Sequence, residues 1–311
     1  MTASVVRTPV AVTTWRPELP VDVRMTLGSM VRGGADPCHR YATDGSLWRT
    51  SRMPAGPATF RLTQRGLHEV TCEAWGLGAE EVVASLPDML GGRDDPAGFD
   101  PRHPLLRDAY ARHPGLRVPR TGRVMEALIP AILEQKITGK QAHSAFRWLL
   151  RKYGDAAPGP APAGMVVMPT SEQWRHIPSW DWHRAGVEPP QSRTVVTCAR
   201  VANRLEECVG LPMEDAYRRM RSIPGVGLWT AAEVASRALG DADSLSVGDY
   251  HTCKIVGYAL TGKPLDDDGM VELLESWRPH RYRVVRLLEL TPAAHPPRRG
   301  PRMTIQDHRR H

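Results

Sequence analysis

Two hydrophobic periods divide the chain, and the first of them is that of a β-strand. Phe60 and Leu62 alternate with polar residues, and after a turn at 64–66 Val70 and Cys72 do the same. A period of two residues predicts a hairpin with one buried face. The run from 80 to 90 then has helical spacing and ends at two glycines. Strands followed by a helix predict a mixed α/β module in the first part of the chain.

From residue 121 onward the period is helical throughout. Apolar residues at 124, 128, 129, 132 and 133 form one stripe, and further helices are predicted from Gly139 to Gly154 and from 191 to 208. The pattern therefore indicates an α+β protein, with a mixed α/β domain over 1–112 and an all-helical domain over 113–291. Residues 155–164 are predicted to be a flexible linker, and residues 292–311 a basic, disordered tail.

The most informative stretch is a turn between two predicted helices. Pro224, Gly225 and Gly227 stop the helix that spans 213–222, and a second helix is predicted from Gly227 until Gly240 supplies a left-handed stop. Backbone N–H groups at a helix N-terminus, with glycines that allow close approach, suit a nucleic acid phosphate. Such a contact positions a duplex without reading its sequence.

A carboxylate follows this hairpin. Asp249 comes 22 residues after Gly227, past a polar loop at 241–248, and begins the next helical pattern. As the first residue of a helix it would accept backbone N–H bonds and lie at the positive end of the helix dipole, and both effects favour the ionised form. The residues alone leave two interpretations open: an N-cap, or a functional carboxylate beside the groove that the hairpin would hold.

Charge and cysteine usage narrow the class of protein without deciding it. The formal net charge is +7 over 311 residues, but the last nineteen residues hold five Arg against one Asp. The folded part is therefore only mildly basic, and composition permits DNA binding without requiring it. The five cysteines are scattered without a Cys-x-x-Cys pair, which argues against a disulfide framework, a zinc site and an iron–sulfur cluster. No leader and no membrane-spanning apolar run are recognised, so a reducing cytoplasm is expected.

The pattern Ile-Pro-Gly-Val-Gly-x-Trp-Thr-Ala, then a loop and Asp-Tyr, resembles the helix-hairpin-helix (HhH-GPD) DNA glycosylases, and specifically the bacterial 3-methyladenine DNA glycosylase II (AlkA-like) branch. Segments 113–119, 131–138 and 277–282 agree with that family in order, and the resemblance covers roughly residues 12–290. It implies that the mixed domain packs against the helical body. It also implies a cytoplasmic monomer that acts on damaged duplex DNA, away from membranes, and requires no cofactor.

The resemblance assigns several DNA contacts. Gln135 and Lys136, at a joint between two helices, would face the minor groove. Lys136 stands where the family tends to have an apolar residue, so Gln135 or Ile137 is expected to fill the gap left by a flipped base while Lys136 binds phosphate. The carbonyls of Arg221, Ile223 and Val226 would hold a structural Na⁺ or K⁺. The hairpin and the helix after it would bind the DNA backbone through Ile223, Pro224, Gly225, Val226, Gly227 and Thr230.

The same resemblance places a base pocket around Trp229 and Tyr250. Bifunctional relatives carry a nucleophilic lysine at the position of Trp229, so no Schiff-base step is expected, and the indole is either a stacking ring or a core residue. Glu233 and Glu289 replace expected aromatics and make the pocket more acidic. An unpaired buried carboxylate at Glu233 would be costly, which favours a cationic alkylated base as its partner. Two other interpretations stay open: a site that is tuned to another lesion, and helices that turn both glutamates outward.

The predicted activity is hydrolysis of the N-glycosidic bond of a damaged, alkylated purine after base flipping, as the first step of base excision repair. Asp249 is the predicted catalytic residue, because a carboxylate beside the sugar stabilises the positive charge that develops on the deoxyribose as the base leaves. Two alternatives stay open: a non-catalytic lesion-binding protein of the same fold, and a glycosylase for a different base lesion.

Overall fold

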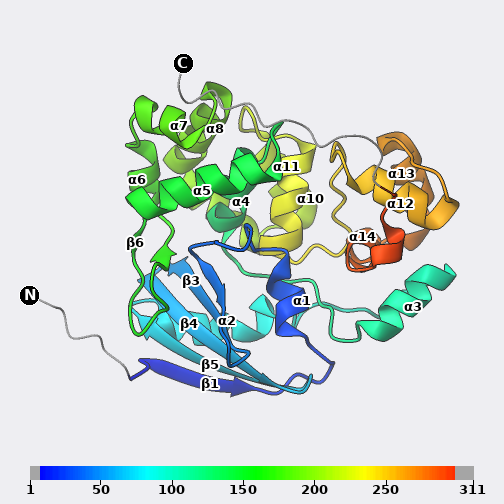
Figure 1. The fold of residues 1–311 in the computed structure, drawn as a ribbon, viewed down its shortest axis with the longest axis horizontal. Helices are drawn as coiled ribbons and strands as arrows, with labels where there is room; N and C mark the ends of the chain where they lie inside the picture. Colours follow the sequence, from blue (N-terminus) through cyan, green and yellow to red (C-terminus); the bar gives the residue numbers. More distant parts are fainter. Residues whose placement is uncertain (1–7, 298–311) are drawn as a thin grey trace, which may run out of the picture.

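The computed structural model describes residues 8–297, and it is built from a sheet module and a helical body (Figure 1). The sheet is antiparallel, with five strands in the order β1-β5-β4-β3-β2. Helix α2 (Ala79–Met89) packs on this sheet, and α1 (Val23–Gly28) and α3 (Pro104–Arg112) belong to the same part of the chain. The strands are β1 (Ala11–Trp15), β2 (His39–Tyr41), β3 (Leu47–Met53), β4 (Gly56–Arg65) and β5 (Glu69–Gly76).

The hairpin predicted from alternating hydrophobicity is confirmed as β4 and β5. Leu62 pairs with Cys72, and both side chains are buried on the same face as Phe60 and Val70. The predicted helix from 80 to 90 is α2, and the chain turns after it at Gly91, where φ is +80°. In both strands, the apolar side chains at every second position face the same side of the sheet, and the core lies on that side.

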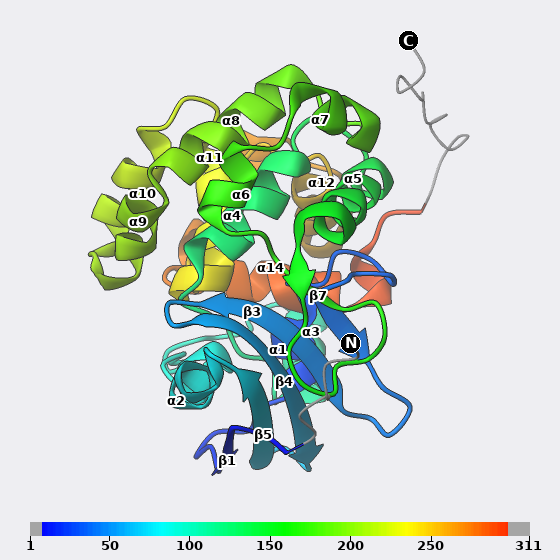
Figure 2. The same ribbon diagram turned by 90° about the vertical axis from the view of Figure 1, so that its left-hand side faces the viewer.

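The remaining helices form the body above the sheet (Figure 2). Their bounds are α4 (Val124–Leu133), α5 (Gly139–Tyr153), α6 (Ser171–Arg175), α7 (Ser179–Ala185), α8 (Pro189–Arg200), α9 (Ala202–Glu206), α10 (Met213–Arg221), α11 (Leu228–Val234), α12 (Thr252–Thr261), α13 (Asp267–Leu274) and α14 (Arg281–Glu289). A π-helical turn, η2 (Ala235–Leu239), continues α11 and ends at Gly240, as predicted. The long helix predicted over 191–208 is interrupted at Val201 and forms α8 and α9.

Buried side chains form three clusters. One lies between the sheet and helices α1 and α2, one lies among the elements from α4 to η2, and one lies around α12 to α14. Leu106 and Ala109 of α3 belong to the third cluster, so this helix packs on α14 although it precedes residue 112. The domain boundary at 112/113 stays a prediction. Ala294, in the short 3-10 turn η4 (Pro292–Ala294), is fully buried. The chain is therefore packed at least that far into the predicted tail, and 298–311 lie outside the described residues.

The segment 155–164, predicted to be a flexible linker, is packed instead. Its first two residues form β6 (Asp155–Ala156), which pairs with β7 (Val166–Val167) just beyond the segment. Gly159 has φ +72°, and any Cβ there would clash with the ring of Trp75 in the sheet. The Gly and Pro residues that predict flexibility here instead adopt the turn conformations that let this loop lie on the sheet.

Candidate active site

A cavity of about 270 Å³ lies at the meeting point of α4, α11, the loop after η2, α12 and α14. Helix α11 and η2 present Trp229, Glu233 and Arg237 to it at four-residue spacing, which places them on one helix face. Helix α14 presents a second stripe. The complete lining is Glu134, Trp229, Glu233, Arg237, Ser244, Ser246, Asp249, His251, Thr252, Ile255, Tyr282, Val285 and Glu289.

Asp249 lines this cavity, and hydrogen bonds fix its carboxylate. The Oδ1 atom accepts from the backbone N–H of His251 at 2.8 Å, and from the N–H and hydroxyl of Thr252, both at 2.9 Å. The Oδ2 atom accepts only a long hydrogen bond, 3.3 Å, from the indole Nε1–H of Trp229. One oxygen is therefore committed to orienting the group, while the other remains available to the cavity.

The position of Asp249 relative to its helix differs from the prediction. Helix α12 begins at Thr252, so Asp249 lies in the turn before it rather than at its first residue. The side chain nevertheless accepts N–H groups at the start of that helix. The two interpretations of Asp249 are thus compatible, because the cap contacts use Oδ1 and leave Oδ2.

Glu233 is in the cavity but is not unpaired, which corrects the expected role of this residue. Its Oε2 atom lies 2.8 Å from Nη1 of Arg237, and its Oε1 atom accepts from the Ser246 hydroxyl at 2.6 Å. The side chains of Glu233 and Arg237 are 13% and 12% exposed. A cationic base is expected as the partner of Glu233 only if the carboxylate is unpaired. That premise is wrong, because an arginine of the same helix neutralises the carboxylate.

Of the other two predicted pocket residues, one lines the cavity and the other does not. Glu289 lines the cavity and forms an ion pair with Arg286, so its charge is also compensated. Tyr250 does not line the cavity: it is 70% exposed, and Nζ of Lys254 lies 3.2 Å from its ring centroid. The ring is therefore outside the base pocket in which it was expected.

Glu134, Arg237 and Tyr282 also line the cavity, although they were not among the predicted pocket residues. Burial alone would raise the pKa of the Glu134 carboxyl, but Arg32, His143 and Arg237 lower it to about 2. The ion pair between Glu134 Oε1 and Arg32 Nε measures 3.3 Å and joins α4 to the segment before β2. Arg32 is far away in the chain, so only the fold could reveal this contact.

Tyr282 carries a hydroxyl that is buried and makes no hydrogen bond with the described residues. Because a buried unpaired hydroxyl costs free energy, Tyr282→Phe is expected to leave the thermal unfolding midpoint equal to or above that of the parent. Tyr153→Phe is the matched control, since the Tyr153 hydroxyl donates to Asp181 and its removal should lower the midpoint. Calorimetry on the two variants checks this. A clear loss of stability in Tyr282→Phe would contradict it.

The hairpin between α10 and α11 is anchored from inside. Ile223 and Val226 are buried, whereas Pro224, Gly225 and Gly227 are exposed. Gly225 has φ +91°, and a Cβ there would clash with the Thr194 hydroxyl of α8, so this position requires glycine. Gly227 has open space around it. The exposed turn is thus almost all backbone, as the sequence predicts.

The joint between α4 and α5 lies against this hairpin. The amide Nε2 of Gln135 donates to the carbonyl of Gly225 at 2.9 Å and to the hydroxyl of Thr230 at 2.8 Å. Lys136 is exposed and has φ +58°, the one positive value at a non-glycine residue among the described residues. A strained, exposed residue is a feature that functional sites often show. Gln135 is occupied by the hairpin, whereas Lys136 is exposed and Ile137 is half-buried.

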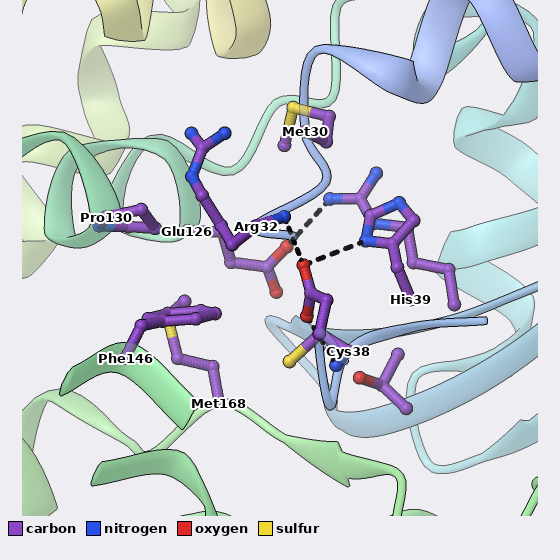
Figure 3. A pocket seen from close by; sticks show the side chains of 11 residues that line it. Met30, Arg32, Cys38, His39, Glu126, Pro130, Phe146 and Met168 are labelled. Carbon is purple, nitrogen blue, oxygen red and sulfur yellow. Dashed lines mark hydrogen bonds and ion pairs between the residues drawn. The ribbon is translucent and has the colours of Figure 1, made fainter. Parts of the chain in front are cut away.

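A second, smaller cavity lies between the sheet and α4 (Figure 3). It measures about 20 Å³, which is room for one water molecule. Asp36 accepts the backbone N–H groups of Arg32 and Cys38, and Arg49 pairs with Glu126 at 3.2 Å. Burial, Arg49 and Arg32 lower the pKa of His39 well below its usual value, so this ring is neutral. The cluster is a packed polar junction between the two parts of the fold and is too small for a base.

No helix in 8–297 is long and apolar enough to cross a membrane. Within the same residues, no three His, Cys, Asp or Glu side chains are arranged to hold a metal ion.

Known proteins resemble this chain in sequence and in fold. No family model matches the chain. Proteins from two Mycobacterium tuberculosis strains, each described as a probable bifunctional transcriptional activator/DNA repair enzyme AlkA, are 29% identical over an alignment of 253 residues. The alignment covers 76% of this chain and 48% of theirs. The chain thus spans about half the length of the curated relatives it matches.

Solved structures match over nearly the whole chain. A 3-methyladenine DNA glycosylase from Archaeoglobus fulgidus superposes with a TM-score of 0.75 at 19% identity, over 89% of this chain and 97% of that one. An 8-oxoguanine glycosylase/lyase from Clostridium acetobutylicum gives a TM-score of 0.68 at 12% identity, over 93% and 99% of the two chains. The chain therefore has the fold of the helix-hairpin-helix DNA glycosylases and resembles the AlkA-like 3-methyladenine DNA glycosylases among them.

Proposed function

We propose that this chain is a monofunctional DNA glycosylase that hydrolyses the N-glycosidic bond of damaged, alkylated purines in duplex DNA and so begins base excision repair. The observation that carries the proposal is the Asp249 carboxylate, held by its Oδ1 contacts at the wall of a 270 Å³ cavity beside an exposed backbone hairpin. A flipped nucleotide needs a cavity for its base, a carboxylate near its sugar and a docking element for its backbone. These three features lie together here.

In the proposed reaction, the bond between the base nitrogen and C1′ breaks, and the base leaves with the bonding electrons. Positive charge develops on the deoxyribose, and the ionised Oδ2 side of Asp249 stabilises it. A water molecule then attacks C1′ and loses a proton. None of the described residues that line the cavity is a lysine, and Trp229 contacts Asp249 through its indole N–H. The lining therefore supports hydrolysis rather than a Schiff-base lyase step.

The partner is proposed to be damaged duplex DNA, bound by a monomer. A second Clostridium acetobutylicum structure with a TM-score of 0.67 holds double-stranded DNA with cytosine opposite 8-oxoguanine. In this chain, the exposed turn after Pro224 and the exposed cation Lys136 lie on segments that the Gln135–Gly225 hydrogen bond joins, which suits a phosphate backbone.

We also propose a monovalent cation, Na⁺ or K⁺, at the carbonyls of Arg221, Ile223 and Val226. The donor set fits such an ion, because carbonyl oxygens are hard ligands. The carbonyl of Ile223 accepts one hydrogen bond, from the N–H of Val226 at 3.0 Å, and a carbonyl oxygen has two lone pairs. A cation there would hold the turn in the shape that presents its N–H groups. The hydrolysis itself involves no cofactor in this proposal.

Gly227→Val is expected to weaken binding to duplex DNA by at least tenfold, and equally for all sequences. The space around Gly227 is open and its φ is −88°, so a side chain is tolerated by the fold but would hold a phosphate away from the turn. Fluorescence anisotropy with two unrelated duplexes measures the effect, and the unfolding midpoint should not change.

Gly225→Ala serves as the contrasting variant, because its Cβ clashes with Thr194 inside the fold and should lower stability. If Gly227→Val bound DNA as tightly as the parent, the hairpin would not be the docking element.

The experiment that tests the proposed function is incubation of the full chain with randomly methylated duplex DNA, followed by chromatography of the released bases. Release of free methylated purines, with the DNA strand left uncut until alkali is added, is the expected result. Binding to damaged DNA without release of any base would instead identify a lesion-binding protein. Strand cleavage without alkali would contradict the monofunctional assignment.

A further inference from the structure

Arg237 is a cation built into the wall of the cavity. It lies in the π-helical turn η2, and turns of this kind occur often at functional sites. Its Nε–H donates to the carbonyl of Ser29 at 3.0 Å, which fixes the guanidinium from the N-terminal module. Its Nη1 donates to the backbone carbonyl of Glu233 at 2.9 Å and lies 2.8 Å from the Glu233 carboxylate. Two of the three guanidinium nitrogens are therefore committed to the protein.

The third nitrogen, Nη2, is left for a ligand. It makes no hydrogen bond to any of the described residues, and it is not among the nitrogen atoms sealed without a partner inside the described chain. Because Arg237 lines the cavity, its two Nη2–H groups are donors available there. The guanidinium plane is held at both ends, so the direction of these donors is fixed.

The carboxylates around the cavity do not give the site a large negative charge, because most of them are paired with arginines. Glu233 pairs with Arg237, Glu134 with Arg32, and Glu289 with Arg286. Only Asp249 lacks a cationic partner, and its proposed role is at the sugar. Recognition of the base in such a cavity depends on matching hydrogen bonds, because paired charges offer little net attraction to a cation.

We propose that Arg237 reads the extruded base by donating Nη2–H to a carbonyl oxygen at purine position 6, so that the site prefers 6-oxopurines to 6-aminopurines. The inference rests on the proposed function. A guanidinium can only donate, so an amino group at position 6 would face it donor to donor, whereas a carbonyl is a matched acceptor. Leaving the buried donor unpaired against a 6-aminopurine penalises that base.

The test compares two bases released from one methylated duplex DNA: 7-methylguanine, which has the 6-carbonyl, and 7-methyladenine, which has the 6-amino group. Both are cationic and carry the methyl group at the same nitrogen, so charge and methyl position are matched. An oligonucleotide duplex containing hypoxanthine adds a 6-carbonyl without the 2-amino group of guanine. Single-turnover rates on the full chain, each divided by the spontaneous release rate of the same base, are expected to be at least tenfold higher for the two 6-oxopurines than for 7-methyladenine.

Two variants remove the donor while keeping the charge balanced. Glu233→Gln/Arg237→Gln replaces the ion pair by two amides, each of which can donate or accept. Arg237→Lys keeps the cation but lacks the forked geometry that reaches both Glu233 and the base. Both variants are expected to lower the ratio of 7-methylguanine to 7-methyladenine release at least tenfold. The matched control is Arg123→Gln/Glu206→Gln, a part-buried ion pair of 3.2 Å outside the cavity lining, which should leave the ratio unchanged.

The outcomes are distinct. A parent ratio near one, or a ratio that survives in both folded variants, would overturn the role of Arg237 while base release still supports a glycosylase. Circular dichroism establishes that each variant is folded, and Arg237→Lys carries the test if the double variant is not. A parent that releases none of the three bases would overturn the proposed function itself, and this inference with it.

Discussion

Asp249→Asn is expected to lower the single-turnover rate of base release by at least about a hundredfold, while the affinity for duplex DNA changes little. The asparagine carbonyl can still accept the N–H groups of His251 and Thr252, so the turn before α12 is retained. The charge that faces the developing positive sugar is lost, and that charge matters mainly in the transition state. Rates of methylated-base release and anisotropy on an uncleaved duplex measure the two quantities.

Asp266→Asn is the matched control for this prediction. Asp266 caps α13 by accepting the N–H of Gly269 at 2.9 Å, and it does not line the cavity. The same chemical change at a second helix start should leave base release at the parent rate. Base release by Asp249→Asn at the rate of the Asp266→Asn control would mean that Asp249 is an N-terminal cap and nothing more.

Local rules were sufficient for the hairpin that presents the proposed docking surface. Pro224, Gly225 and Gly227 cannot continue a helix, so the stop after α10 and the restart at α11 follow from residue type alone. The need for glycine at residue 225 has two sources. Its positive φ could be expected from a tight turn, but the clash with Thr194 depends on α8, which only the fold brings alongside.

The chemistry of the cavity wall could be predicted only in part. Trp229, Glu233 and Arg237 share one face because they are four residues apart, and a helical period is enough to see this. A Glu and an Arg at that spacing are most often a solvated surface pair. Here they are buried because Ser29, more than two hundred residues earlier in the chain, covers the guanidinium. No local pattern carries that information, and the expectation of an unpaired Glu233 carboxylate was wrong for this reason.

Asp94→Ala is expected to destabilise the folded chain by about 3–5 kcal/mol. Asp94 lies after α2 and forms a two-pronged ion pair with Arg283 of α14, at 2.6 and 3.1 Å, with both side chains 1% exposed. The same carboxylate accepts the backbone N–H of Val118 at 3.2 Å. Removing it leaves the Arg283 guanidinium buried without its counter-ion. Thermal unfolding of the variant and the parent measures the loss.

The cost arises from the unpaired charge rather than from a large net gain of the pair, and a second variant separates the two. Asp94→Leu/Arg283→Met replaces both partners by apolar side chains of similar length, so neither charge is left buried alone. This double variant should recover most of the stability that Asp94→Ala loses. Helix α14 also carries Tyr282 and Glu289 of the cavity lining. The rate of base release by the double variant therefore reports whether the Asp94–Arg283 pair aligns the cavity wall. A double variant as unstable as Asp94→Ala would show that the pair itself, with its bond to Val118, contributes the stability.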